Sequence, residues 1–187
     1  MHRLVPHRHR PHGGGSCPAP GDRGGGNRAV TPGTDLPADE TVLASLTPEH
    51  RTRLMSLARD VSFAGATRVF EEGGGADRFW ILRTGAVDLD IQVPGRGRAV
   101  VETLGAGELL GWSWLCPPRQ WHLGAGTRGP VCAWEFDASS VRDLCSEQPA
   151  LGLALVTVVA GTVGERLRAT RTRLLDLYGP QESRPTS

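Results

Sequence analysis

The sequence has no lysine and no marked excess of charge of either sign. All 21 basic residues are arginines, and 20 acidic residues balance them, so the formal net charge is +1. A surface that binds nucleic acid usually shows itself as a clear excess of basic residues. The charge balance therefore gives no indication that nucleic acid is a partner.

Cysteine throughout the chain, and histidine beyond residue 35, are too scattered to form a metal-binding or redox motif. The four cysteines contain no C-x-x-C pair: Cys17, Cys116, Cys132 and Cys145. Their spacing excludes zinc-ribbon and thioredoxin-like motifs. A metal-dependent enzyme of the cupin type needs two or three histidines and a carboxylate around one metal, but beyond residue 35 only His50 and His122 occur. We therefore expect no metal, no cofactor and no catalytic residue.

A secretory signal and a clear membrane span are also missing. The N-terminus carries arginine and histidine but no apolar segment, so we expect a cytoplasmic protein. The longest uncharged stretch, residues 148–164, is at the short edge of a membrane span, and glycine and threonine interrupt it. This composition favours a helix that packs in a soluble protein over a helix that crosses a membrane.

Glycine and proline, 25 and 14 residues, are abundant and concentrated near the N-terminus. We expect residues 1–35 to be a disordered tail whose H-R-H-R-P-H stretch binds metal only adventitiously. One domain is expected over residues 36–178, with its strands at about 61–136 and its last helices at 137–178. Residues 179–187 are expected to be a second disordered tail.

The middle of the chain reads as one helix followed by many short strands. Thr47, Pro48 and Glu49 have the pattern of a helix start. The apolar period then changes to two, with turns at glycine, proline or aspartate, which indicates an antiparallel roll of the jelly-roll type. Asp137 is expected to cap a short helix that ends near Cys145.

A long helix is expected from Pro149 to Tyr178, where Gly179 and Pro180 end it. Apolar residues recur in it at alternating spacings of three and four: Leu153, Val156, Ala160, Val163, Leu167, Thr170, Leu174 and Leu177. This heptad pattern predicts a parallel homodimer through residues 149–178. The alternative is a helix that folds back on its own roll.

The order of these elements resembles the cyclic-nucleotide-binding domain of the cyclic AMP receptor and Fnr-type regulators. The resemblance covers residues 43–178 and includes five residues of the roll's turn motif: Phe70, Gly73, Ile81, Gly85 and Val87. It implies a β-roll followed by a dimerisation helix. It also implies a small-molecule ligand, cyclic AMP first and cyclic GMP second.

The resemblance further implies a phosphate-binding cassette with a short helix. Gly107, Glu108 and Leu109 match its start, where the glutamate binds the ribose 2′-hydroxyl; the alternative for Glu108 is a plain helix cap. Arg119 matches the arginine that pairs with the phosphate. Gln120 stands where a small hydroxyl residue is expected. Trp121 follows it where the family has a small residue.

In the last helix, Thr170 matches the family's threonine that hydrogen-bonds the adenine amino group. The alternative is a tolerated polar residue on the heptad seam. Arg171 replaces the small hydroxyl that reaches across the dimer in the family. Arg166 matches a basic residue that can pair with Glu108.

The chain ends shortly after the long helix, so we expect the family's helix-turn-helix domain to be missing and DNA not to be bound directly. The leading hypothesis is a stand-alone, non-catalytic regulatory module that senses a cyclic nucleotide and signals through its dimer helix to an unidentified protein partner. The alternative is a degenerate fold without ligand that acts as a dimeric interaction scaffold.

Overall fold

The computed structural model describes residues 41–178, so the two expected tails, 1–35 and 179–187, lie outside the described residues. The elements follow in this order: η2 (Val42–Ser45), α1 (Pro48–Met55), β1 (Arg59–Phe63), β2 (Arg68–Phe70), β3 (Arg78–Thr84), β4 (Val87–Val93), β5 (Gly97–Leu104), β6 (Leu109–Leu110), η3 (Trp112–Trp114), β7 (Gly124–Thr127), β8 (Val131–Asp137), α2 (Ala138–Glu147) and α3 (Pro149–Tyr178).

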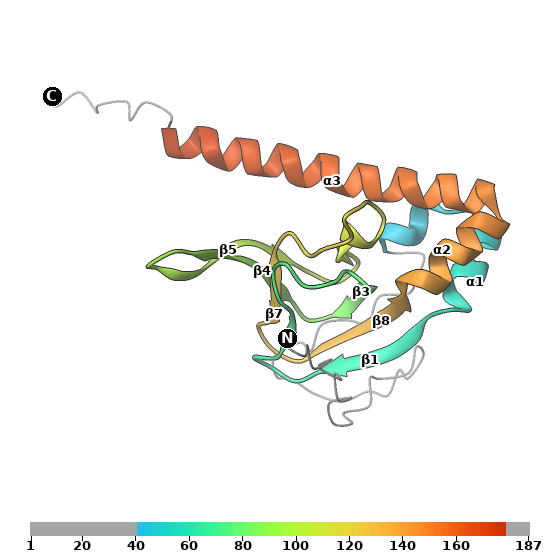
Figure 1. Ribbon diagram of the computed structural model, residues 1–187, viewed down its shortest axis with the longest axis horizontal. Helices are drawn as coiled ribbons and strands as arrows, with labels where there is room; N and C mark the ends of the chain where they lie inside the picture. Colours follow the sequence, from blue (N-terminus) through green and yellow to red (C-terminus); the bar gives the residue numbers. More distant parts are fainter. Residues whose placement is uncertain (1–40, 179–187) are drawn as a thin grey trace, which may run out of the picture.

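The strands form two antiparallel sheets of four. Their orders are β1-β8-β3-β6 and β2-β7-β4-β5. Figure 1 shows α3 running across the whole length of the roll, with α2 connecting it to β8. The expected β-roll with a long C-terminal helix is therefore confirmed. One of its strands, β6, is only two residues long.

Local chemistry explains where the helices begin. The Thr47 hydroxyl accepts a hydrogen bond from the His50 backbone N–H at 3.3 Å, and Pro48 opens α1. The Asp137 carboxylate accepts one from the Ser140 backbone N–H at 2.8 Å and begins α2. Each of these N-caps satisfies a backbone donor that has no partner within its own helix.

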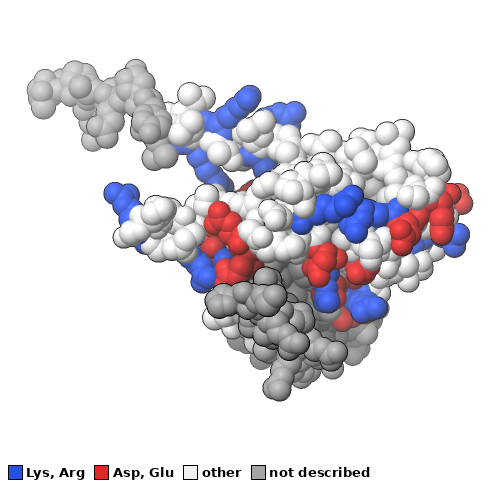
Figure 2. All heavy atoms as spheres, in the orientation of Figure 1, with Lys and Arg blue, Asp and Glu red and all other residues white. Residues whose placement is uncertain are grey.

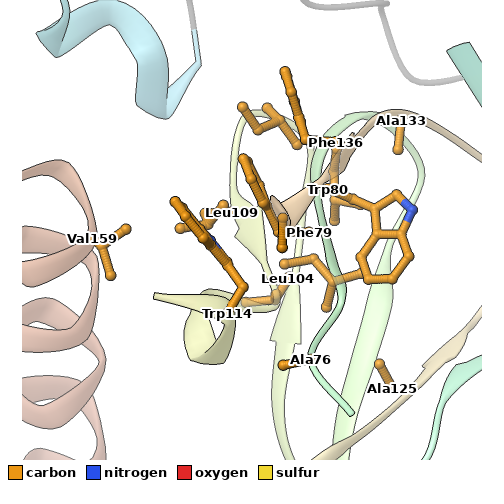
Figure 3. Packing of buried hydrophobic residues seen from close by; sticks show 14 of the residues in the cluster. Ala76, Phe79, Trp80, Leu104, Leu109, Trp114, Ala125, Ala133, Phe136 and Val159 are labelled. Atoms are coloured by element: carbon orange, nitrogen blue, oxygen red, sulfur yellow. The ribbon is translucent and has the colours of Figure 1, made fainter. Parts of the chain in front are cut away.

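Aromatic side chains fill the roll's interior. Phe79 stacks between Trp114 and Phe136, with both ring-centroid distances at 4.7 Å. At the other end of the core, Trp121 stacks on Phe70 at 4.1 Å. Figure 3 shows Val159 of α3 facing this aromatic cluster, so the helix is part of the same core.

The helix α3 packs on the rest of the chain along one side of its first half. Leu151, Leu155 and Val159 are buried there. Four residues of the predicted heptad seam lie on another side and are exposed: Leu153 (69%), Val156 (45%), Leu167 (51%) and Leu174 (53%). The roll therefore leaves these four seam residues largely exposed, whereas Val163 of the same seam packs against the core.

The same helix meets the length and hydropathy criteria for a membrane span over Pro149–Leu175. An apolar helix at a protein interface meets these criteria equally well. The exposed seam already accounts for the apolar composition, so the hydropathy does not establish a membrane span.

Candidate functional site

A cavity of about 270 Å³ lies between the roll and the second half of α3. This volume is close to the lower limit for small-molecule sites, about 300 Å³. Its lining combines an apolar wall with charged groups: Leu89, Val101, Glu102, Trp112, Leu123, Val163, Arg166, Leu167, Thr170 and Arg173. Figure 2 shows arginine atoms grouped along the last part of α3, whereas the middle of that helix is mostly uncharged.

The helix brings three polar side chains to the cavity. Arg166, Thr170 and Arg173 are spaced at i, i+4 and i+7, which places them on one face of a helix. The Thr170 hydroxyl donates to the Arg166 carbonyl oxygen at 2.9 Å. Arg173 reaches the roll, because its Nη1 donates to the Val101 carbonyl oxygen at 2.8 Å.

Arg166 is the most enclosed of these groups, with only 14% of its side chain exposed. Its Nη2 donates to the Leu109 carbonyl oxygen, and its Nε lies 3.6 Å from Oε2 of Glu102. Burial lowers the pKa of Arg166 below its usual value, while the carboxylates of Glu102 and Glu108 act in the opposite direction. Arginine keeps its charge at neutral pH even so.

Trp112 forms part of the cavity's apolar wall. It is the first residue of η3, directly after Gly111, whose φ of 86° lies in the left-handed region. A side chain on Gly111 would also meet the ring of Trp121 at 2.8 Å, so only glycine fits there. Trp112 stacks on His122 with ring centroids 5.4 Å apart.

Residues 60–148 match the family model of the cyclic nucleotide-binding domain. Residues 60–148 belong to a cyclic nucleotide-binding domain. It is 25% identical over 136 residues to a CRP-like cAMP-activated global transcriptional regulator of Mycobacterium tuberculosis. The match covers 73% of this chain and 59% of that relative, so the chain spans little more than half of the relative's length.

Solved structures show the same fold. A cyclic nucleotide-binding domain from Methylobacillus flagellatus has a TM-score of 0.68 at 17% identity, and the match covers 81% of this chain and 90% of that one. The catabolite activator protein of Thermus thermophilus has a TM-score of 0.59 at 20% identity, covering 73% and 62% of the two chains. At these identities the likeness shows the fold alone.

Of the residues predicted to bind the ligand, the structure brings only Thr170 to the cavity lining. Thr170 lines it, whereas the Glu108 side chain is exposed and accepts a hydrogen bond from the Gly105 backbone N–H at 2.6 Å. Gly107 N donates to the Leu82 carbonyl oxygen at 2.8 Å. Leu109 is buried in β6 and contributes only its carbonyl group, which accepts from Arg166. The hypothetical Arg166–Glu108 pair is replaced by the Arg166–Glu102 pair.

Arg119 and Gln120 are also outside the cavity lining, and both are exposed. Arg119 has a left-handed φ of 56°, and its carbonyl oxygen accepts from the Ala76 backbone N–H at 2.8 Å. Gln120 forms an isolated β-bridge with Gly75. The next residue, Trp121, enters the core and is not part of this cavity's lining.

Sequence reasoning did not assign a ligand role to Glu102, Trp112 or Arg173. The spacing of Arg166, Thr170 and Arg173 on one helix face is a signal that was readable in advance. Glu102 gives a weaker signal, since it is one polar residue in a mostly exposed strand. Trp112 is half-buried at the cavity, and its position there depends on the assembled fold.

A second hollow, of about 460 Å³, is lined by residues of β2, β4 and β5 and of the turn after β2. Its arginines are already engaged: Arg68 pairs with Asp90 and Glu71, and Arg98 pairs with Glu71 at 2.9 Å. Hydrogen bonding to Asp90 raises the pKa of Arg68. Because these charges neutralise one another, the hollow at α3 is the better ligand site.

Proposed function

We propose that the domain is a non-catalytic sensor whose ligand binds in the cavity between the roll and α3. The observation that carries this proposal is the shared lining of the cavity. Arg166, Thr170 and Arg173 come from α3, and Val101 and Glu102 come from β5. A ligand that contacts both sides stabilises one arrangement of the helix relative to the roll, and this shift is the signal.

The ligand we propose is a cyclic nucleotide, with cyclic AMP first and cyclic GMP second. Two arginines and one glutamate among the lining residues leave one positive charge, and a cyclic nucleotide carries a single negative charge. Trp112 and the neighbouring leucines offer an apolar wall for a purine. The family and the cAMP-activated relative support the same choice.

The signal would pass through a parallel homodimer to a protein partner in the cytoplasm. The exposed part of the heptad seam of α3 supports this proposal, because Leu153, Val156, Leu167 and Leu174 remain 45–69% exposed within residues 41–178. A second copy of the same seam is self-complementary and would bury all four.

Calorimetric titration of the 187-residue chain with cyclic AMP and cyclic GMP tests the ligand. We expect micromolar affinity, reduced at least tenfold in Arg173→Gln. Arg171→Gln is the matched control, since Arg171 is on the same helix but does not line the cavity. Affinity that is absent, or equal in the two variants, would contradict this site.

The same titration decides the role of Arg119. Arg119→Gln should leave the affinity unchanged, because the side chain is exposed and outside the lining. A loss of affinity in this variant would instead support the phosphate role that the family resemblance implies for Arg119, together with the cassette residues Gly107, Glu108, Leu109 and Gln120.

The second candidate is a dimeric scaffold that binds no nucleotide. It is favoured by the position of Trp112, a large apolar residue at the start of the short helix, and by the exposure of Glu108 and Arg119 away from the cavity. This function predicts an unchanged melting temperature with millimolar cyclic nucleotide and an intact dimer.

A further inference from the structure

Two arginines in the second half of α3 have no acidic partner. Arg168 and Arg171 are exposed, and among residues 41–175 no carboxylate lies within ion-pair distance of either. Exposure alone does not explain this, because the side chain of Arg128 on the roll is 60% exposed and still pairs with Asp88 at 2.7 Å. The two guanidinium groups on α3 are therefore available to the carboxylates of another molecule.

The stability of the helix does not explain why positive charge is concentrated there. Residues 166–173 contain four arginines and no acidic residue. Arg168 and Arg171 are one turn apart, and like charges at such a spacing destabilise a helix. The helix dipole favours basic residues only in the last turn, and the last turn of α3 contains none. A partner of opposite charge would remove the repulsion.

An exposed leucine lies next to the two arginines. Arg168, Arg171 and Leu175 are spaced at i, i+3 and i+7, which places them on one face of the helix. Leu175 is 71% exposed, and it is not one of the residues of the predicted heptad seam, so the proposed dimer does not cover it. We call these three residues the outer patch of α3. It combines two unpaired positive charges with one apolar contact.

We propose that the outer patch is the docking site for an acidic amphipathic helix of a partner protein. Carboxylates of that helix pair with Arg168 and Arg171, and an apolar side chain covers Leu175. This inference rests on the proposed sensor function and specifies the chemistry of its protein partner. Two carboxylates one turn apart on a second helix match the spacing of the arginines, and each guanidinium can hold a carboxylate through two parallel hydrogen bonds.

The composition of the patch favours a protein helix over the other anionic partners. A phosphate backbone has no apolar group to cover Leu175, and surfaces that bind nucleic acid show a larger excess of basic residues. Basic segments that bind anionic lipids contain about four to eight basic residues, whereas the outer patch has two, Arg168 and Arg171.

The position of the patch connects it to the ligand cavity. The cavity is lined by Arg166, Thr170 and Arg173 of the same turns, and helical spacing places the outer patch on the opposite side of α3. A ligand that shifts this half of the helix therefore also shifts the outer patch, without competing with the partner for the same side chains.

The experiment measures how tightly the full chain binds a synthetic helical peptide with glutamates one turn apart and a leucine one turn beyond them. The double substitution Arg168→Gln with Arg171→Gln should weaken binding at least tenfold, since two ion pairs together are of that order. Leu175→Ala should weaken it about fivefold through lost apolar contact. Arg59→Gln with Arg96→Gln is the matched control: it removes the same charge from exposed arginines of the roll and should bind as the wild type does.

The same peptide with glutamine in place of glutamate should bind at least tenfold more weakly. Equal binding of the two peptides, or of the Arg168→Gln/Arg171→Gln variant and its control, would overturn the proposal. Tighter binding to phosphatidylserine vesicles or to duplex DNA than to the peptide would also overturn it and assign the patch to that partner. Arg168→Glu with Arg171→Glu should instead prefer a lysine version of the peptide, a gain that a misfolded variant would not show.

The docking proposal and the sensor function can fail separately, because Arg168 and Arg171 do not line the cavity. Cyclic AMP binding without peptide binding would overturn the docking site and leave the sensor function standing. Peptide binding without cyclic nucleotide binding would overturn the sensor function and support the outer patch as part of a scaffold.

Discussion

The two halves of α3 are held to the rest of the chain by different interactions. In the first half, Leu151, Leu155 and Val159 are buried at 0%, 4% and 6% exposure. In the second half, beyond Gly164, the link to the roll consists of polar contacts from Arg166 and Arg173. The first half is held by apolar packing and is called the packed half below. The second half is held by polar contacts and is called the tethered half.

This difference indicates which part of the helix can respond to a ligand. A buried leucine contributes about 1.5–3 kcal/mol through removal of its surface from water, whereas a hydrogen bond or exposed ion pair contributes about 1 kcal/mol or less. Local opening draws on the regions with few buried contacts. We expect the second half, which lines the cavity, to move while the first half stays docked.

The largest effect on stability should come from a substitution that creates a cavity beneath the packed half. Leu151→Ala is expected to lower the free energy of unfolding by about 2–5 kcal/mol, because a fully buried leucine leaves a cavity. Leu167→Ala in the tethered half should change it by about 0.5 kcal/mol or less in the monomer. Urea denaturation of both variants at low protein concentration measures the contrast, and equal losses would contradict it.

The next effect concerns association rather than folding. Leu167→Glu places a charge on the exposed seam and should raise the dimer dissociation constant by at least tenfold, seen by sedimentation velocity as a shift to single-chain mass. Ala169→Glu, on the same turn but outside the seam, is the control and should remain dimeric. A wild-type chain that is monomeric at all concentrations would refute the seam's role.

The fold followed from the sequence wherever local signals determine it. The caps at Thr47 and Asp137 and the full extent of α3 were predictable, because capping residues and apolar period are local properties. The strand β6 was not, since a strand of two residues has no period of its own. Its pairing with Trp80 and Ile81 of β3 depends on the assembled sheet.

The candidate site was predictable only in part, because the sequence does not determine at which of two glycines the short helix begins. Gly107 and Gly111 are four residues apart, and each is a reasonable start for the cassette helix. The structure begins the short helix after Gly111, because Trp121 packs against the space where its side chain would be. That contact joins residues ten positions apart through the core, and no local pattern encodes it.

The smallest effect tests the support beneath the packed half. The helix α2 begins at Asp137 and contacts α3 closely at Gly152, where a side chain would meet Cys145 at 3.1 Å. Asp137→Ala removes the N-cap and should lower the free energy of unfolding by about 1 kcal/mol at pH 7.

Hydrogen bonds from Ser139 and Ser140 lower the pKa of Asp137 to about 2, below the value of about 3.9 for an unfolded chain. The stabilisation is therefore complete above pH 4 and is lost as the pH falls towards 2. Urea denaturation at pH 7, 4 and 3 should show that the difference in unfolding free energy between wild type and Asp137→Ala becomes smaller at the lowest pH. Asp143→Ala, on the same helix, is the control.

In Asp137→Ala at pH 7, the rate of amide hydrogen exchange should rise in residues 149–163 and not in residues 164–175. A rise confined to residues 164–175 would mean that α2 does not support the packed half of α3.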